Sequence, residues 1–351
     1  VNWSGASDPH SGIDGFSYVW DLSPSTLPDA TKDAEENIVT VTSGSLADGT
    51  WYFHIRTCDN VGNWNLSATH FGPIRLDTVA PKGVDGASST THLPGTWNNR
   101  TAISAQWWGA SDAASGVGGY SFVFDSLTGT VPDAVAEVNG SFPNGTSPAL
   151  PDGGTYYVHI RVVDEAGNWN GTAFHLGPFK IDATPPDNPV TFRIISDHTI
   201  GVWSPVQYIE VSWEGFTDGT AGVDGFSFLW DGAAGTIPDP VKDIEEADNS
   251  TKSTKLASGR FWLHIRTRDN AGNWNLTALH IGPFMIDVDV PSAVPATDEE
   301  NITGSPVLKW AWPPAADTHS GLAGYLVTVG TTPDGSDVVD GLLTVNVTFE
   351  L

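Results

Sequence analysis

"DNVGNWNLSATHFGPIRLDTVAP" (Asp59–Pro81) returns twice in this chain, as "DEAGNWNGTAFHLGPFKIDATPP" from Asp164 and as "DNAGNWNLTALHIGPFMIDVDVP" from Asp269. The copies start 105 residues apart and keep the same turn residues, aromatic residues and prolines. A repeat of this length indicates one domain type used in series. Since any site in one copy is then expected in all of them, the pattern favours a structural or display protein over a catalyst.

The front half of the repeat recurs as well, as a Trp that precedes a Gly by nine positions. The pairs are Trp3/Gly12, Trp107/Gly116, Trp213/Gly222 and Trp312/Gly321. We therefore predict four domains: residues 1–79 without their first strand, 80–184, 185–289, and a truncated 290–351. About 100 residues is enough for a domain to bury its own core. We interpret the chain as an excerpt of a longer array; the alternative is that neighbouring molecules complete its ends by strand addition.

The chain is strongly acidic, with 42 Asp and Glu against 15 Lys and Arg and a net charge of −27. This sign disfavours nucleic acid as a partner, because phosphates attract basic proteins. It suits a solvated acidic surface or cation binding. No apolar run is long enough to span a bilayer, so we expect no membrane span in this segment. Cys58 is the only cysteine, which excludes an internal disulfide.

Asn-X-Ser/Thr sequons are far more frequent than chance predicts and include ten of the 18 Asn residues. Three of them follow the repeated Trp at the repeat period. This pattern predicts N-linked glycans and secretion; the alternative interpretation is that surface loops are simply rich in Asn, Ser and Thr. The ten candidate sites are Asn2, Asn65, Asn99, Asn139, Asn144, Asn170, Asn249, Asn275, Asn301 and Asn346.

Strand signals dominate the chain, and helical periodicity is absent. "FSYVWD" (Phe16–Asp21) and "WYFHIRT" (Trp51–Thr57) both alternate in side-chain character, and both recur in the next two repeats. On the second strand we expect Trp51, Phe53 and Ile55 to face inward and the residues between them to face outward. Short strands separated by Gly, Asp and Pro turns predict an all-β fold, a tandem array of β-sandwich domains.

"LKWAWPPAADTHSGLAGYLV" (Leu308–Val327) resembles the second and third strands of a fibronectin type III domain, and "LADGTWYFHIRTCDNVGN" (Leu46–Asn63) resembles its sixth strand and following loop. The resemblance covers all four repeats and implies a seven-stranded sandwich. The chain departs from it at the tyrosine corner, where Trp51, Tyr156 and Phe261 stand and a single copy has the hydroxyl. The Asp-X-Ala/Val-Gly-Asn loop is more similar to immunoglobulin-like surface repeats of bacteria and archaea. Both sandwich families stay open, and both imply extracellular spacers or binding modules.

The Asp-X-X-Gly-Asn loop has two interpretations. Gly62 and its counterparts suit a positive φ, and turn chemistry alone explains the flanking Asp and Asn. The other interpretation is calcium, because carboxylates of this loop and of the last strand's end supply hard oxygens. The resemblance to surface repeats implies that such carboxylates near a domain junction hold a calcium that stiffens the array. The candidate calcium ligands are Asp59, Asp77, Asp164, Asp182, Asp269 and Asp287.

His54 and Arg56 share one strand and His70 lies on the next, and all three positions recur in the other two repeats. A His pair is only the start of a metal site, since no third and fourth ligand follow at suitable spacing. We expect the Arg to pair across the sheet with Asp21, and the His to cover an outer face. We expect Trp64 and its counterparts to pack against a neighbouring domain, because exposed aromatic patches usually mark contacts.

The sequence contains no Gly-X-Ser-X-Gly, no His-Glu-X-X-His and no Gly-rich phosphate loop, so we expect no enzyme. The Pro-containing linkers "DTVAPKG", "DATPPDN" and "DVDVPSA" predict semi-rigid joints. We predict an extracellular structural protein of an archaeal or bacterial cell surface: a glycosylated rod in a surface layer, filament or stalk. Its partners would be copies of itself or other surface proteins. The alternatives are an adhesin or carbohydrate-binding module, and an accessory region of a secreted hydrolase.

Overall fold

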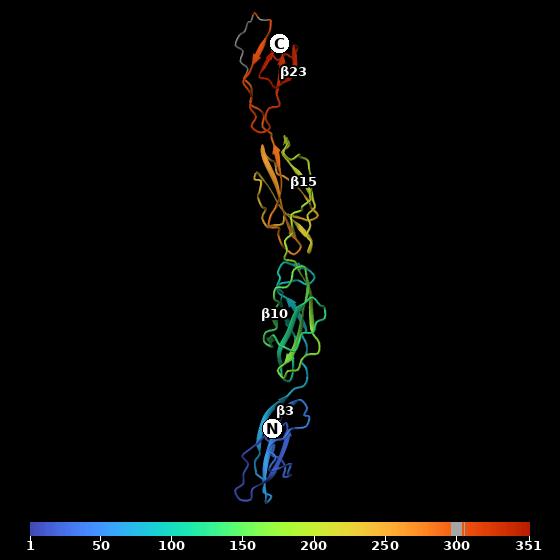
Figure 1. The fold of residues 1–351 in the computed structure, drawn as a ribbon, viewed down its shortest axis with the longest axis vertical. Coiled ribbons are helices and arrows are strands. Elements are labelled where there is room, and N and C mark those ends of the chain that lie inside the picture. The colour runs from blue at the N-terminus through green and yellow to red at the C-terminus, as the bar shows by residue number, and fades with distance from the viewer. Residues whose placement is uncertain (296–303, 305) are drawn as a thin grey trace. The chain divides into compact units, whose positions relative to one another are not determined.

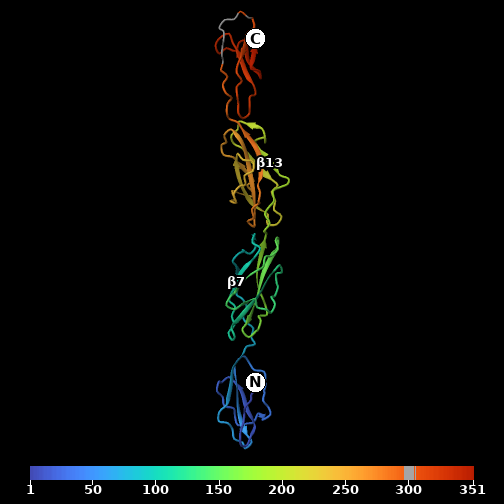
Figure 2. The same cartoon turned by 60° about the vertical axis from the view of Figure 1, so that its left-hand side comes forward.

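The chain is built of strands and loops, as Figures 1 and 2 show. The computed structural model describes residues 1–295, 304 and 306–351, with strands from β1 (Ile13–Asp21) to β24 (Thr348–Glu350). Among these described residues, no helix is long and apolar enough to cross a membrane. The chain divides into two compact units, Val1–Ile181 and Asp182–Leu351.

The second half of the first unit is a sandwich of two sheets. The smaller sheet has the order β10-β7-β5, and the larger has the order β6-β12-β11-β8-β9. The strands are β5 (Gly86–Ser89), β6 (Trp97–Asn98), β7 (Ser104–Trp108), β8 (Val117–Asp125), β9 (Val138–Asn139), β10 (Asn144–Thr146), β11 (Thr155–Asp164) and β12 (Phe174–Ile181). Seven strands were implied by the resemblance. The structure has eight, including the two-residue strands β6 and β9 at the two edges of the larger sheet.

The core of this sandwich lies between its two sheets. Trp107 from β7, Val158 and Ile160 from β11, and Phe179 from β12 are each at most 2% exposed. Inward residues alternate along the strands, as a half-buried sheet requires. The expectation of an all-β chain of tandem β-sandwich domains is confirmed.

The first half of the same unit contains one four-stranded sheet of order β2-β1-β3-β4. Its strands are β1, β2 (Ala34–Glu35), β3 (Gly49–Asp59) and β4 (Thr69–Leu76). Phe53 and Ile55 of β3 are 1% and 8% exposed and pack with Phe16 of β1, so their predicted inward orientation is confirmed.

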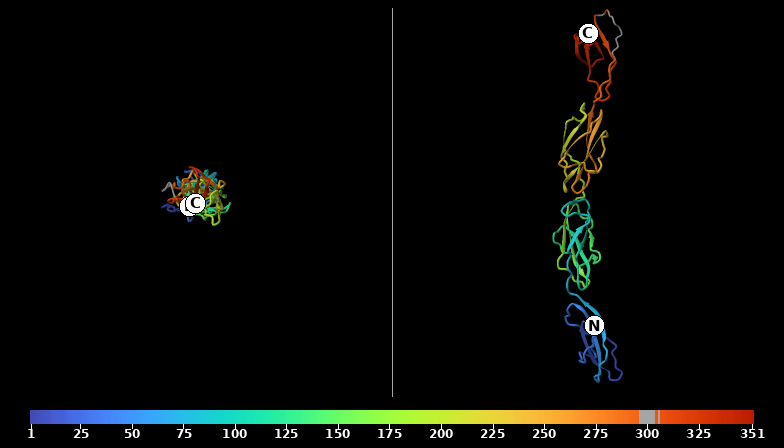
Figure 3. Two further views of the ribbon diagram at one scale, coloured as in Figure 1. Left: turned by 90° about the horizontal axis from the view of Figure 1, so that it is seen from above. Right: turned by 180° about the vertical axis from the view of Figure 1, so that it is seen from behind.

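The second unit begins with a sandwich of the same type, which can be followed in the view from behind in Figure 3. Its sheets have the orders β13-β15-β18 and β14-β20-β19-β16-β17, followed by the two-stranded sheets β21-β24 and β22-β23. The strands are β13 (Arg193–Ser196), β14 (Trp203–Ser204), β15 (Glu210–Glu214), β16 (Val223–Asp231), β17 (Ile244–Glu245), β18 (Ser250–Lys252), β19 (Gly259–Asp269), β20 (Leu279–Ile286), β21 (Lys309–Ala311), β22 (Tyr325–Val329) and β23 (Val339–Thr344).

A bulge interrupts each long hairpin between a Trp/Tyr/Phe strand and the strand that follows it. In the β3–β4 pair the register shifts between Trp51 and Phe53, opposite Gly72. Gly72 has φ +152°, and a Cβ there would lie 2.6 Å from Tyr52 Cδ1 and 3.0 Å from Trp51 O. Only glycine fits both the backbone conformation and the space. The pairing resumes just beyond the bulge, which places His54 directly opposite His70.

The corner bond expected of a single copy is present. The Tyr156 hydroxyl donates a hydrogen bond to Pro151 O at 2.8 Å. In the first repeat the indole Nε1 of Trp51 donates to Ala47 O at 2.8 Å. A different donor therefore anchors the preceding loop at the same position of the fold.

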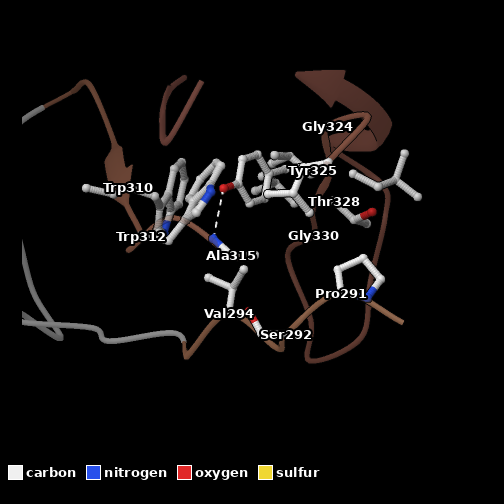
Figure 4. Close-up of a pocket in the computed structure, with 15 residues that line it drawn as sticks. Pro291, Ser292, Val294, Trp310, Trp312, Ala315, Gly324, Tyr325, Thr328 and Gly330 are labelled. Carbon is white, nitrogen blue, oxygen red and sulfur yellow. Dashed lines mark hydrogen bonds between the residues drawn. The ribbon is translucent and has the colours of Figure 1, made fainter. Parts of the chain in front are cut away.

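A hollow of 660 Å³ lies between β21 and β22 in the second unit (Figure 4). Trp312 and Tyr325 meet there edge to face, with ring centroids 5.4 Å apart, and the Tyr325 hydroxyl accepts a hydrogen bond from Ala315 N. The pair Trp107–Tyr120 has the same arrangement at 5.5 Å within a filled core. We therefore interpret the hollow as space between the two layers of a sandwich and assign it no ligand.

Candidate functional site

The Asp-X-X-Gly-Asn loop forms a tight turn that also holds the end of the preceding repeat. In the first unit, Asp164 Oδ1 accepts a hydrogen bond from Asn168 N at 2.8 Å, and Gly167 has φ +93°. The side-chain amide of Asn168 donates both to Asp164 Oδ2, at 2.8 Å, and to the backbone oxygen of Asp77, at 3.0 Å. Turn chemistry therefore accounts for the contacts within the motif. The same Asn side chain also donates a hydrogen bond to the backbone of the preceding repeat.

The second unit has the same contact. Asn273 donates from its side-chain amide to Asp269 Oδ2, at 2.7 Å, and to Asp182 O, at 2.8 Å. The bonded carbonyls belong to Asp77 in the first unit and to Asp182 in the second, two equivalent positions of the repeat. The same set of hydrogen bonds therefore recurs at equivalent positions in the two units.

These loops bring carboxylates together. In the first unit, one carboxylate oxygen each from Asp77, Asp112 and Asp164 lie within 4.8 Å of one another. In the second unit, Asp182, Asp218 and Asp269 form the same cluster. We call these the first and second junction clusters. Four of the six candidate calcium ligands therefore lie in these two clusters.

The other two candidates lie elsewhere. Asp287 is grouped with Asp289 and His319, which replaces one carboxylate by an imidazole. Asp59 belongs to no such group within the described residues. Its pKa is held below the usual range, above all by the hydrogen bonds from the Asn63 side chain and backbone.

The sequence analysis missed the third carboxylate of both junction clusters. Asp112 and Asp218 each stand four residues before the repeated Gly, and their Oδ1 atoms accept from the backbone N of Gly116 and Gly222 at 2.9 Å. Asp8 and Asp317 occupy the same position before their own Gly. The recurring Asp four residues before the Gly could have indicated this carboxylate. From the sequence alone, however, a hydrogen-bonding role within the turn explains the same spacing, and only the fold shows that the Asp lies beside the strand end.

Burial makes the second junction cluster electrostatically unfavourable without a cation. Asp182 and Asp269 are both 0% exposed. Burial raises the pKa of each carboxyl, and the nearby Asp218 carboxylate raises both pKa values further. None of the three forms an ion pair with Lys or Arg in the described part of the chain. Buried like charges of this kind require a counter-charge or a proton.

The first junction cluster carries a second sign of a missing partner. Asp77 Oδ2 is buried, yet it has no hydrogen-bond partner. Buried carboxylate oxygens are normally hydrogen-bonded or coordinated. Three carboxylates offer up to six oxygens, and calcium takes six to eight oxygen ligands. The donor set of both clusters therefore fits calcium.

The predicted roles of His and Arg were wrong. His54, His159 and His264 are 0% exposed, not placed on an open outer face. They approach the strand Asp residues themselves; His159 Nε2 lies 3.2 Å from Asp125 Oδ1. The imidazole, and not the guanidinium, contacts that carboxylate because His159 and Asp125 lie near one another on the paired strands β11 and β8.

The Arg instead reaches loop carbonyls and an indole ring. Arg161 Nε donates to Asn170 O at 2.7 Å, and its guanidinium lies over the Trp169 ring at 5.2 Å. Arg56 and Arg266 stack in the same way on Trp64 and Trp274. The cation–π contact involves an Arg of the same repeat. These Trp rings therefore contact the Arg of their own repeat. The sequence analysis expected packing against a neighbouring domain and did not predict this contact.

The sequons differ in accessibility. Asn275 is 5% exposed and its side-chain amide donates to Asn188 Oδ1 at 3.2 Å; Asn170 is half-buried and donates to Pro81 O at 3.0 Å. Asn301 lies outside the described residues. The remaining seven are exposed: Asn2, Asn65, Asn99, Asn139, Asn144, Asn249 and Asn346.

Comparison with known proteins supplies no closer assignment. No protein-family model matches the chain, and no curated protein matches it. Among solved structures it is similar to the FN1–FN3 domains of chicken CNTN1. The sequence identity is 16%, the match covers 82% of this chain and 93% of that chain, and the TM-score is 0.34. The assignment of tandem β-sandwich domains therefore rests on the strand pairing and cores described above.

Proposed function

We propose that the chain is a non-enzymatic, extracellular structural protein whose sandwich repeats form a semi-rigid rod in a surface layer, surface filament or stalk. The observation that carries this proposal is the repeated junction contact. In each unit one Asn side chain joins its own loop to the backbone oxygen of an Asp that stands 91 positions earlier. A contact reused in this way fits one domain type arranged in series, as a load-bearing or spacing array requires.

We further propose that both junction clusters bind calcium. The support is the convergence of three carboxylates in each, the burial of Asp182 and Asp269, and the unpartnered Asp77 oxygen. A bound divalent cation would neutralise the mutual repulsion and tie the strand end to the next repeat's loops. In that role calcium stiffens the joint.

Electron microscopy of cells that produce the chain, with antibodies against it, tests the structural role. We expect label on the cell surface, on a lattice or on filaments. Label confined to the cell interior would contradict the proposal. Self-association of the purified chain, measured by analytical ultracentrifugation, separates assembly with itself from assembly with other surface proteins.

We also propose that the glycans are confined to accessible sequons. Glycan transfer needs a free Asn side-chain amide, and in Asn275 this group is buried and hydrogen-bonded. We expect glycopeptide mass spectrometry of the native protein to find glycan on Asn139 and none on Asn275. Asn139 is the matched control, since it is an exposed sequon Asn on a short strand. High occupancy at Asn275 would contradict this junction geometry in the mature protein.

A further inference from the structure

The same pair of His residues faces across two strands in three sheets. His54 stands opposite His70, His159 opposite His175, and His264 opposite His280. The two Nδ1 atoms lie 2.6 Å apart in the first two pairs and 2.7 Å apart in the third. Because the same Nδ1–Nδ1 contact recurs in three repeats, it is a regular feature of the domain and not a chance approach of two side chains.

The buried ring of each pair is fixed by a carboxylate on its other side. His159 Nε2 lies 3.2 Å from Asp125 Oδ1, and Asp125 Oδ2 accepts a hydrogen bond from Thr130 Oγ1 at 2.6 Å. A carboxylate only accepts hydrogen bonds, so Nε2 carries the hydrogen and the neutral ring has its lone pair at Nδ1. That lone pair is directed at His175 Nδ1.

The second ring of each pair is exposed. Around the middle pair, the polar partners of the rings are Asp125, with Thr130 behind it, and the opposing ring. The 2.6 Å contact between His159 Nδ1 and His175 Nδ1 is a hydrogen bond, so one hydrogen lies between the two nitrogens and a metal ion that binds both must replace it.

We propose that each His pair is a two-ligand site for a divalent transition-metal ion of the zinc, copper or nickel class. Imidazole nitrogen suits these ions, and a carboxylate bonded to the far nitrogen is the usual partner of a metal-bound His. Zn–N bonds of about 2.0–2.1 Å in a tetrahedral site separate the two nitrogens by about 3.3 Å. The exposed ring must therefore swing outward by several tenths of an ångström, and water completes the coordination.

Isothermal titration of the whole chain with zinc chloride, in buffer containing calcium, tests the stoichiometry. We expect three zinc ions per chain, two after His175→Ala, and none after the triple change His70→Ala, His175→Ala and His280→Ala. His10→Ala is the matched control, since His10 is exposed and unpaired with another His, and it should keep three. The series is repeated with His319→Ala, because His319 lies beside Asp287 and Asp289.

The role of the carboxylate is tested with Asp125→Asn. Loss of such a partner weakens metal affinity by about 10–100-fold, so one of the three sites should weaken by that factor while the other two stay unchanged. Asp239→Asn, an exposed Asp outside the network, should leave all three unchanged. Binding should also weaken in acid, because protons compete for the imidazole nitrogens.

Nitrogen NMR of the His side chains provides an independent readout on the unmodified chain. Zinc should shift the Nδ1 resonances of all six paired rings and leave those of His92 and His198 unchanged. The proposal is overturned if zinc produces no such shift, or if the triple variant, with an unchanged melting temperature, still binds three ions. The pair would then be a hydrogen bond that shares one proton. If the triple variant melts lower, the NMR result decides.

Discussion

Replacing Trp107 by Ala is expected to lower the free energy of unfolding of the first unit by about 3–5 kcal/mol, the usual cost of removing a large buried aromatic side chain. Trp107 is 2% exposed and lies at the centre of the sandwich core, with Tyr120 5.5 Å and Phe122 5.4 Å away between ring centroids. The loss combines buried apolar area, aromatic contacts and the cavity left behind. Urea denaturation followed by fluorescence measures it.

The neighbouring residue is the matched control. Trp108 stands on the same strand but faces the other way and is 52% exposed. Since the cavity term is absent, Trp108→Ala should cost less than about 1 kcal/mol. Equal costs for the two variants would contradict the inward and outward assignment of β7.

Removing calcium is expected to give the second large effect. A ligand that binds only the folded state adds about 2.7 kcal/mol when its free concentration is a hundred times its Kd. We therefore expect the melting temperature of the whole chain to fall when a chelator replaces millimolar calcium. An unchanged melting temperature would contradict the calcium proposal and leave the tandem fold untouched.

The Asp182→Asn variant tests whether the stabilisation by calcium arises at the second junction cluster. The change removes one of two adjacent buried charges while keeping the size of the side chain. In chelator, the melting temperature of this variant should be at least as high as that of the unmodified chain. Calcium should raise the melting temperature of the variant by a smaller amount. Asp187→Asn, in the same linker but exposed, should retain the full gain. A full gain in Asp182→Asn would place calcium elsewhere.

The same cluster predicts how the calcium gain depends on pH. The pKa values of Asp182 and Asp269 in the folded chain are raised above 3.8, so in chelator the folded state binds protons more tightly than the unfolded state. Their contribution to stability is therefore complete below 3.8 and is lost as pH rises through the raised pKa values. Calcium replaces the missing protons at neutral pH. The difference in melting temperature between calcium and chelator should thus be larger at pH 7 than at pH 4.5, and this pH dependence should be reduced in Asp182→Asn.

Much of the architecture could be predicted because it is encoded locally. The 105-residue period, the alternation of Phe53 and Ile55, and the glycine at Gly62, Gly167 and Gly272 depend on neighbours along the chain. The structure gives these glycines φ of +88°, +93° and +97°, as the turn motif predicts. The all-β sandwich class follows from such local patterns. The strand count did not follow, because β6 and β9 are two-residue edge strands that exist only through pairing with a neighbour.

The candidate sites were predicted less completely, because their chemistry depends on contacts between distant residues. Asp77 and Asp164 are 87 positions apart in the sequence and were named as separate candidates; the fold brings them together and adds Asp112. His159 looked like an outward residue by alternation, yet it is 0% exposed and its ring contacts His175 and Asp125. Periodicity reports which face of a strand a residue occupies, but not what covers that face.

For this protein, the sequence alone determined the repeat, the strand character, the acidic surface and the turn glycines, since each is a property of composition or short-range spacing. Only the tertiary structure decided which carboxylates converge, which sequon amides are buried, and that His rather than Arg takes the strand carboxylate. The physical reason is that burial, desolvation and charge proximity arise when segments far apart in sequence are packed together. The Asp-X-X-Gly-Asn loop illustrates both kinds of information. Its turn can be predicted from five residues, whereas the hydrogen bond from Asn168 to the backbone of Asp77 is visible only in the fold.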